Sequence, residues 1–278
     1  MEKESSMKEE QNNGKNYYNM PQTQKKNLFA TSEKEAAKCP FGLCDGSGII
    51  AYRGTFDTRI CDCMQLQIAK TRMKFAEIPN EFRELKINDF RTDCYKTEIG
   101  QKLAYMAKKL AIEYIKKFDS IKESGKGFYF YSQTKGSGKT RLMASIGNAL
   151  IKRHFKSVRF LTTNNLLDEI KNTFQTEGYS RLMEQIKRVD ILMLDDFGGE
   201  RPTDWVNEVF YSILNDRMTA KKITFFTSNA EAEALQYGER IISRVMKMAM
   251  PVKFPEESIR EAMAKKENES LMTLLMGQ

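Results

Sequence analysis

Two patterns of apolar residues take turns along the chain, and they predict helices and strands in alternation. Residues 98–117 carry apolar side chains three and four positions apart, including Leu103, Ala107 and Leu110, which predicts an amphipathic helix. Short unbroken apolar runs predict buried strands at residues 128–131, 158–161, 191–194, 223–226 and 252–254. Further helical patterns cover residues 64–75, 141–152, 165–174, 180–187, 204–218 and the C-terminal stretch. Because strands separated by helices pair in parallel and are covered on both faces, the sequence predicts an α/β fold.

The residues that precede this pattern differ from it in composition. Residues 1–35 are rich in Lys, Glu, Asn and Gln and too poor in apolar side chains to form a core, which predicts a disordered tail. Residues 1–27 lack the apolar stretch of a signal peptide, and no apolar run approaches the length of a membrane span. We therefore expect a cytoplasmic protein with no membrane contact, divided into residues 1–35, 36–77 and 78–278.

The net charge of +8 is concentrated in one part of the chain. Between Lys102 and Arg159, fourteen basic residues stand against three acidic ones. Such a block is typical of proteins that bind phosphate groups, either of a nucleotide or of a nucleic acid. It is equally typical of a solvated surface, so the charge alone does not decide between the two.

A glycine-rich turn connects the strand predicted at 128–131 to the helix predicted at 141–152. The turn, Gly136-Ser137-Gly138-Lys139-Thr140, has the strand–turn–helix context of a phosphate-binding loop, although Gln133 stands where the motif has its first glycine. Backbone N–H groups and the positive end of the helix dipole favour phosphate oxygens there. We expect Lys139 to reach the β- and γ-phosphates and Thr140 to bind Mg²⁺. The predicted ATP or ADP site consists of Thr134, Lys135, Gly136, Ser137, Gly138, Lys139, Thr140 and Arg141.

Two aspartates directly follow the strand predicted at 191–194. Carboxylates at the end of a buried strand are costly unless they meet a cation. We therefore expect Asp195 to share a magnesium ion with Thr140. Either Asp196 or Glu200 is expected to polarise the attacking water, and the sequence leaves this choice open.

Four cysteines, Cys39, Cys44, Cys61 and Cys63, fall within 25 residues. Four soft ligands at this density predict a structural, tetrahedral zinc site. The spacing departs from the common Cys-x-x-Cys, because four residues separate the first pair and one separates the second. Free thiols and an iron–sulfur cluster therefore stay open as alternatives. Cys94 lies outside the cluster and is predicted to be an ordinary buried thiol.

These motifs, together with three later segments, resemble the AAA+ ATPases of the DnaC and DnaI helicase-loader group. The three segments are residues 194–200 (LDDFGGE), 226–229 (FTSN) and 238–244 (GERIISR), with Trp205 between the first two. The resemblance covers residues 78–254, and the cysteine segment is similar to the amino-terminal zinc module of the DnaI-type loaders. It implies an AAA+ P-loop ATPase domain at 78–278 and a zinc-binding, helicase-interacting module with a linker helix at 36–77.

The resemblance also assigns roles to single residues. Asn229 matches the sensor that positions water and the γ-phosphate, and Arg244 matches the second sensor, which touches bound nucleotide. Arg217 matches the arginine finger presented to a neighbouring subunit, although a surface charge near the end of a helix is an equally good interpretation. The helices predicted at 165–174 and 180–187 resemble the insertion that faces single-stranded DNA in the initiator and loader branch.

The function implied by the resemblance is ATP-dependent loading of a hexameric replicative helicase onto single-stranded DNA during the initiation of replication. It implies slow, Mg²⁺-dependent ATP hydrolysis, stimulated by assembly or by single-stranded DNA, and self-association through AAA+ interfaces. A transposase-helper ATPase that assembles on double-stranded DNA is similar in the AAA+ region, but such helpers generally lack the cysteine module. A non-enzymatic adaptor with a vestigial ATPase is a third alternative, which the intact Lys139, Thr140, Asp195 and Asn229 disfavour.

Overall fold

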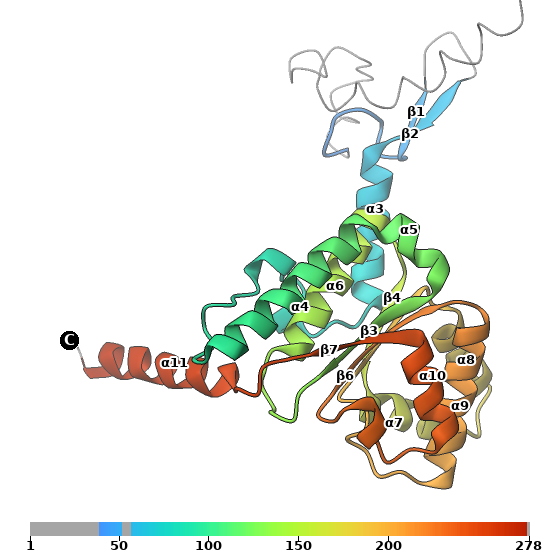
Figure 1. The fold of residues 1–278 in the computed structure, drawn as a ribbon. Helices are drawn as coiled ribbons and strands as arrows, with labels where there is room; N and C mark the ends of the chain where they lie inside the picture. Colours follow the sequence, from blue (N-terminus) through green and yellow to red (C-terminus); the bar gives the residue numbers. More distant parts are fainter. Residues whose placement is uncertain (1–38, 52–56, 277–278) are drawn as a thin grey trace, which may run out of the picture. The chain divides into compact units, whose positions relative to one another are not determined.

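The computed structural model describes residues 39–51 and 57–276 and divides the chain into two compact units, residues 1–68 and 69–278 (Figure 1). The tail predicted at residues 1–35 lies outside the described residues. The division falls inside helix α3 (Asp62–Phe75), which the sequence predicts at 64–75. The module boundaries at 35/36 and 77/78 stay predictions.

The first unit contains a small hairpin and the four clustered cysteines. Strand β1 (Ile49–Ala51) pairs antiparallel with β2 (Thr58–Ile60), with Ile49 opposite Ile60. All three residues of β2 are exposed, so the hairpin has no apolar core of its own. The buried cluster of this unit is made of the cysteines, with Leu43 and Ile50 packed against them. Its stability therefore depends on what holds the cysteines together.

The second unit is built on a five-stranded parallel sheet with the strand order β4-β5-β6-β3-β7. The parallel sheet flanked by helices confirms the fold class predicted from the sequence. The strands are β3 (Lys126–Tyr131), β4 (Val158–Thr162), β5 (Ile191–Asp195), β6 (Ile223–Ser228) and β7 (Ala249–Lys253). The helices are α4 (Glu98–Lys116), α5 (Phe118–Ile121), α6 (Lys139–His154), α7 (Thr163–Thr173), α8 (Gly178–Arg188), α9 (Asp204–Thr219), α10 (Glu239–Met248) and α11 (Ile259–Met276). Short 3₁₀ helices cover Asn80–Phe82, Ile87–Asp89, Lys122–Ser124 and Ala232–Ala234.

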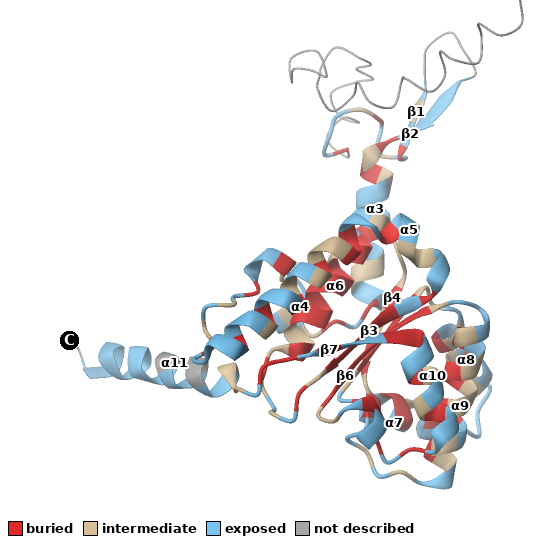
Figure 2. Ribbon diagram, viewed as in Figure 1, coloured by how far each residue is buried: buried red, intermediate tan, exposed pale blue. Residues whose placement is uncertain are grey.

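Helices cover both faces of this sheet, and successive strand residues point to opposite faces. In β5, Ile191 and Met193 pack into the cluster that contains the buried faces of α4 and α6. Leu192 and Leu194 pack into the second cluster, with α7, α8, α9 and α10. A strand buried on both sides has to be apolar throughout, which is why unbroken apolar runs mark these strands in the sequence. Figure 2 shows the buried strands between helices whose outer faces are exposed.

The parallel arrangement brings the carboxyl ends of the central strands to one edge of the sheet. Strands β5, β6 and β3 are neighbours, and Tyr131 at the end of β3 pairs with Ser228 at the end of β6. The glycine-rich turn follows β3, Asp195 ends β5 and Asp196 follows it, and Asn229 follows β6. In open α/β sheets, ligands bind outside the carboxyl ends of the strands. The residues predicted to bind nucleotide therefore share one edge.

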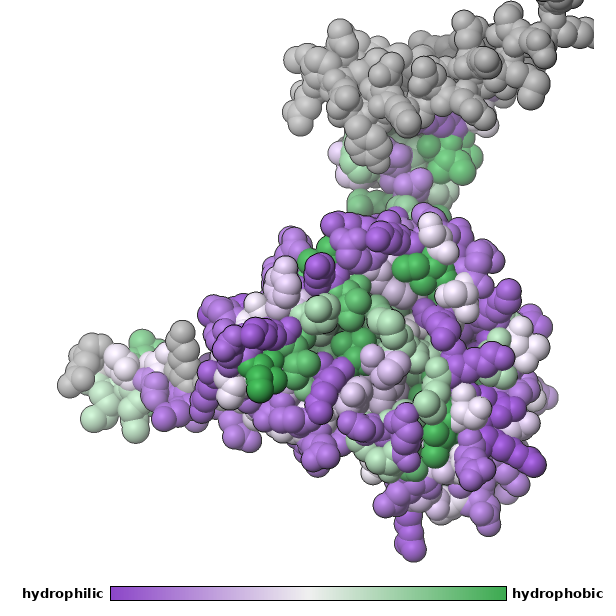
Figure 3. Space-filling model, viewed as in Figure 1, coloured by the Kyte–Doolittle hydropathy of each residue, from purple (hydrophilic) through white to green (hydrophobic). Residues whose placement is uncertain are grey.

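The surface of the second unit that Figure 3 shows is mostly hydrophilic, with apolar side chains in small groups. Within the described part of the chain, no helix combines the length and the apolar character needed to cross a membrane.

Candidate nucleotide-binding site and cysteine cluster

The glycine-rich turn is a tight loop that ends directly on the first residue of α6. Gly136 and Gly138 have φ values of +77° and +95°, which residues with a Cβ rarely adopt. A Cβ on Gly136 would lie 2.9 Å from the Cβ of Arg260 and from the Oγ of Ser258. No side chain caps the N-terminus of α6, so the N–H groups of its first turn are left to a ligand. This is the geometry of an anion site at the start of a helix.

Lys139 is buried in this loop, with 7% of its surface exposed. Its Nζ donates to the carbonyl oxygens of Ser132 (3.1 Å) and Thr134 (3.0 Å) and to the Oγ of Ser137 (3.2 Å). Burial lowers the pKa of Lys139 to about 8, although nearby carboxylates raise it in part. Its three N–H groups thus all have partners inside the loop. A bound phosphate would take the place of these neutral acceptors.

Thr140 and Asp195 meet, as a shared magnesium site requires. Asp195 Oδ1 accepts hydrogen bonds from the Oγ1 of Thr140 (2.8 Å) and from the Oγ1 of Thr227 (2.6 Å). Burial raises the pKa of Asp195, and the two hydroxyl groups lower it in part. A carboxylate and a hydroxyl in contact at the mouth of a phosphate loop are hard oxygen ligands of the kind Mg²⁺ prefers. The residues present therefore fit the ion that the sequence predicts.

The two candidates for polarising water differ in their surroundings. Asp196 is exposed, has a φ of +57°, and accepts a hydrogen bond from Asn229 Nδ2 at 2.6 Å. Glu200 is half-buried, and neither of its carboxylate oxygens has a hydrogen-bond partner. Burial raises the pKa of Glu200 to about 7, although the backbone N–H groups of Gly198, Gly199 and Glu200 lower it in part. The structure thus brings Asn229 to Asp196 and leaves the Glu200 carboxyl group without a side-chain partner.

The arginine-finger role expected for Arg217 is wrong. Its side chain is completely buried, and a buried side chain is not available to a neighbouring subunit. Its guanidinium donates to the carbonyl oxygens of Ile186, Val189 and Ile223 and to the Oγ1 of Thr224, at 2.7–3.0 Å. The sequence holds a signal that points to this outcome, because Arg217 follows the buried Phe210 and Ile213 of α9 by seven and four positions.

Arg244 does not contact the phosphate loop among the hydrogen bonds of the described residues. Its guanidinium binds Asn215 Oδ1 (2.9 Å) and the carbonyl oxygen of Arg240 (2.8 Å), and it stacks 4.2 Å above the ring of Tyr211. Its side chain is therefore engaged between α9 and α10. Besides Arg141, which directly follows Thr140, Arg260 in the first turn of α11 lies against the loop.

The chain that follows β7, including the first turn of α11, packs on the phosphate loop, and no pattern in the sequence predicted this contact. The backbone N–H groups of Ile259 and Arg260 donate to the carbonyl oxygen of Gly136, at 3.0 and 3.4 Å. The charge of Arg260 contributes to lowering the pKa of Lys139, which places the two cations near each other. The sequence holds no local signal for this contact, because it depends on strand order, which places β7 beside β3 in the folded sheet.

A cavity of about 450 Å³ adjoins the loop. Arg141, which the sequence assigned to the nucleotide site, lines it together with Phe90, Cys94 and Ile259. Tyr95 supports the loop beside it, since its hydroxyl donates to the carbonyl oxygen of Ser137 at 2.9 Å. Asp89, Arg91, Glu267 and Ser270 complete the lining of the cavity, so its apolar side chains stand among charged and polar ones. Of the other residues assigned to the site, Thr134 contributes its carbonyl oxygen to Lys139 and Lys135 is exposed.

The four clustered cysteines of the first unit lie close enough to share one ion. Their sulfur atoms are all within 4.8 Å of one another, with 3.8 Å between Cys39 and Cys61 and 3.4 Å between Cys44 and Cys63. Four thiolates around a zinc ion at about 2.3 Å would be about 3.8 Å apart. All four are buried, and burial raises the pKa of Cys63. The donor set and its spacing fit zinc. Cys94 is half-buried and lies outside the cluster.

Comparisons with known proteins give the family. Residues 93–252 match the family described as the bacterial DnaA ATPase domain. The replicative helicase loader DnaI of Bacillus subtilis is 32% identical over 151 residues, which cover 49% of this chain and 48% of DnaI. The replicative helicase loader DnaC of Escherichia coli K12 is 28% identical over 155 residues, which cover 54% of this chain and 60% of DnaC. The chain thus spans about half the length of these relatives.

A solved structure agrees with the sequence matches. The crystal structure of DnaI superimposes with a TM-score of 0.53 and 30% sequence identity, over 64% of this chain and 95% of that one. The chain therefore belongs to the family of bacterial DnaA ATPase domains and, within it, to the DnaC and DnaI group.

Proposed function

We propose that this protein binds and hydrolyses ATP and uses the nucleotide to load a hexameric replicative helicase onto single-stranded DNA. The contact between Thr140 and Asp195 beside the buried Lys139 carries the nucleotide part of the proposal. The names of the relatives, both replicative helicase loaders, support the helicase part. We further expect the protein to act in the cytoplasm.

In the proposed site, the N–H groups at the start of α6 hold the phosphates and Lys139 turns from the loop carbonyls to them. Thr140 and Asp195 hold the magnesium ion, which neutralises phosphate charge during hydrolysis. The base sits in the cavity beside Phe90 and Arg141. Water is oriented by Asn229 and activated by Glu200 or Asp196.

Self-association through AAA+ interfaces is part of the proposal, and hydrolysis then depends on a cation from the neighbouring subunit. With Arg217 buried, the exposed Arg240 and the half-exposed Arg244 on α10 are the candidates for that cation. Arg244 is held in place by Asn215 and Tyr211, so its guanidinium is already ordered before a neighbour arrives. We propose that helices α7 and α8 bind single-stranded DNA. We propose that the cysteine module, with zinc bound, binds the helicase.

Co-elution with a hexameric replicative helicase, with and without ATP, tests the proposal. We expect the protein to elute with the helicase and ATP to change the amount bound. Lys139→Ala is expected to abolish the ATP effect, whereas Lys126→Ala, which removes an exposed lysine at the start of β3, is expected to keep it. No helicase binding, with assembly on double-stranded DNA instead, would favour the transposase-helper alternative.

A further inference from the structure

Glu256 lies in the segment that connects β7 to α11, and its carboxylate is bound by the phosphate loop. Its Oε2 accepts hydrogen bonds from the backbone N–H of Thr134 (3.0 Å) and from the Oγ of Ser132 (2.9 Å). Its Oε1 accepts from the backbone N–H of Gln133 at 3.2 Å. Burial raises the pKa of Glu256, but these hydrogen bonds have the larger combined effect, so the pKa is lowered overall. The side chain is therefore ionised at neutral pH.

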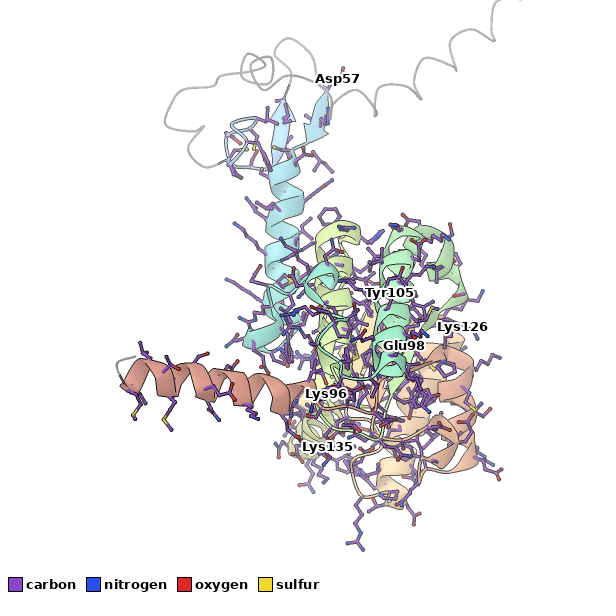
Figure 4. All side chains as sticks on the ribbon, turned by 60° about the vertical axis from the view of Figure 1, so that its left-hand side comes forward. Asp57, Lys96, Glu98, Tyr105, Lys126 and Lys135 are labelled. Carbon is purple, nitrogen blue, oxygen red and sulfur yellow. The ribbon has the colours of Figure 1, made fainter. Side chains whose placement is uncertain are left out.

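The neighbouring residues hold Glu256 at this position. Glu257 turns the other way and accepts hydrogen bonds from the backbone N–H groups of Lys96 and Thr97 and from the Thr97 hydroxyl, at the start of α4. Ile259 donates to the carbonyl oxygen of Gly136. Figure 4 shows Lys96 and Lys135 at the same end of the second unit. Two consecutive glutamates thus bind two different elements, and only the first of them touches the phosphate loop.

The charge of Glu256 acts on the same lysine that a nucleotide would use. Among the carboxylates that raise the pKa of Lys139, Glu256 has the largest effect, ahead of Asp196 and Asp195. Bound ATP brings more negative charge to Lys139 than ADP does, because of the γ-phosphate. A fixed carboxylate close enough to act on Lys139 therefore repels ATP more strongly than ADP.

We propose that Glu256 is a specificity-determining residue that weakens the preference of the loop for ATP over ADP. The Glu256 carboxylate is a fixed negative charge, bound to the backbone N–H groups of Gln133 and Thr134. It repels the γ-phosphate of ATP, which ADP does not have. This inference rests on the proposed ATP site and deepens it. It implies that removing the charge while keeping the hydrogen-bond acceptor favours ATP selectively.

The test measures the Kd values of Mg²⁺ complexes of ADP and of a non-hydrolysable ATP analogue, for the full chain and for Glu256→Gln. Because the carboxylate is partly solvated, we expect the ratio of the ADP Kd to the ATP-analogue Kd to rise about threefold at low salt. The difference should vanish in about 1 M salt, where charges are screened within about 3 Å. Glu257→Gln removes an identical charge one residue away and should leave the ratio unchanged.

The remaining outcomes separate this inference from simpler roles. A ratio that stays constant or falls in Glu256→Gln, or that rises equally in Glu257→Gln, overturns it. Glu256→Ala also removes the acceptor, and a purely structural brace predicts that both nucleotides then bind more weakly with the ratio unchanged. The charge role predicts that the ratio rises in this variant too. Lys139→Ala is titrated in parallel: if the wild-type chain binds neither nucleotide, or Lys139→Ala binds both as well as wild type, the proposed ATP site itself fails.

Discussion

Three ionisable side chains at the edge of the sheet, Lys139, Asp195 and Glu200, are at least partly buried. They differ in how many hydrogen bonds replace those that water would make. Lys139 donates to three oxygen atoms, and Asp195 accepts from two hydroxyl groups. Glu200 has no side-chain partner for either carboxylate oxygen, and only the nearby backbone N–H groups of Gly198, Gly199 and Glu200 oppose the effect of its burial. An unsatisfied buried polar group costs about 1–3 kcal/mol, and such groups are found at functional sites more than elsewhere. Of the two candidates for activating water, we therefore favour Glu200 over Asp196.

The pH dependence of ATP hydrolysis tests this choice. A general base acts as the carboxylate, and the pKa of Glu200 is about 7, so kcat/KM is expected to fall with decreasing pH below about 7, approaching tenfold per pH unit. Above about pH 8, kcat/KM is also expected to fall, because Lys139, whose pKa is about 8, loses its proton and its charge. Glu200→Gln is expected to lower the rate by a factor of about 10²–10⁴ with ATP affinity kept. Asp196→Asn serves as the comparison and is expected to retain the acid limb. An acid limb that persists unchanged in Glu200→Gln would show that another group is the base.

At the scale of elements, the most consequential departure from expectation is Arg217 of α9. Its guanidinium joins the last turn of α8 to the beginning of β6, through the carbonyl oxygens of Ile186, Val189 and Ile223. Family resemblance placed this residue at an interface, whereas the apolar periodicity of α9 places it on the buried face. The periodicity predicts the burial of Arg217 correctly, because the residues that a helix buries recur at regular spacings in the local sequence.

Arg217→Met is expected to lower the free energy of unfolding by about 2–4 kcal/mol, because the buried carbonyl groups lose their donor. Chemical denaturation of the full chain measures this. Arg240→Met, on the exposed face of α10, is the matched control and is expected to change the free energy by less than about 0.5 kcal/mol. Equal stability of the two variants would contradict the bracing role of Arg217.

Most elements of the second unit follow from the sequence, but their contacts do not. The strand predicted at 191–194 is observed at Ile191–Asp195, and the helix predicted at 98–117 at Glu98–Lys116. Strand order is a property of the folded sheet and leaves no local pattern. The contacts of Glu256 with the phosphate loop join residues more than 120 positions apart, and no spacing rule covers them. Sequence reasoning therefore found the loop, Thr140 and Asp195, and missed the segment that packs on them.

The cysteine cluster is the element on which the first unit depends, since its hairpin is exposed. We expect one zinc ion per chain, measured by metal analysis of protein purified without chelator. Cys63→Ser is expected to lose the ion and the compactness of this unit, whereas Cys94→Ser is expected to keep both. Protein that contains no zinc, with cysteines that react freely with a thiol reagent, would contradict the zinc site.

At the scale of the whole molecule, a cysteine-rich unit and an ATPase domain of the DnaC and DnaI group are present in one chain. In the proposed function, the first unit binds the helicase, and the second unit binds nucleotide and DNA. With this division, we expect neither unit to load the helicase by itself. We therefore expect damage to the phosphate loop to interfere with delivery of the helicase and not with its capture.

The most direct test is to count helicase hexamers deposited on circular single-stranded DNA, with ATP present, by wild-type protein, Lys139→Ala and Lys126→Ala. We expect wild type and Lys126→Ala to deposit the helicase, and Lys139→Ala to deposit at least tenfold less even though that variant still binds the helicase. Equal deposition by Lys139→Ala and wild type would contradict the central claim that the nucleotide site drives loading.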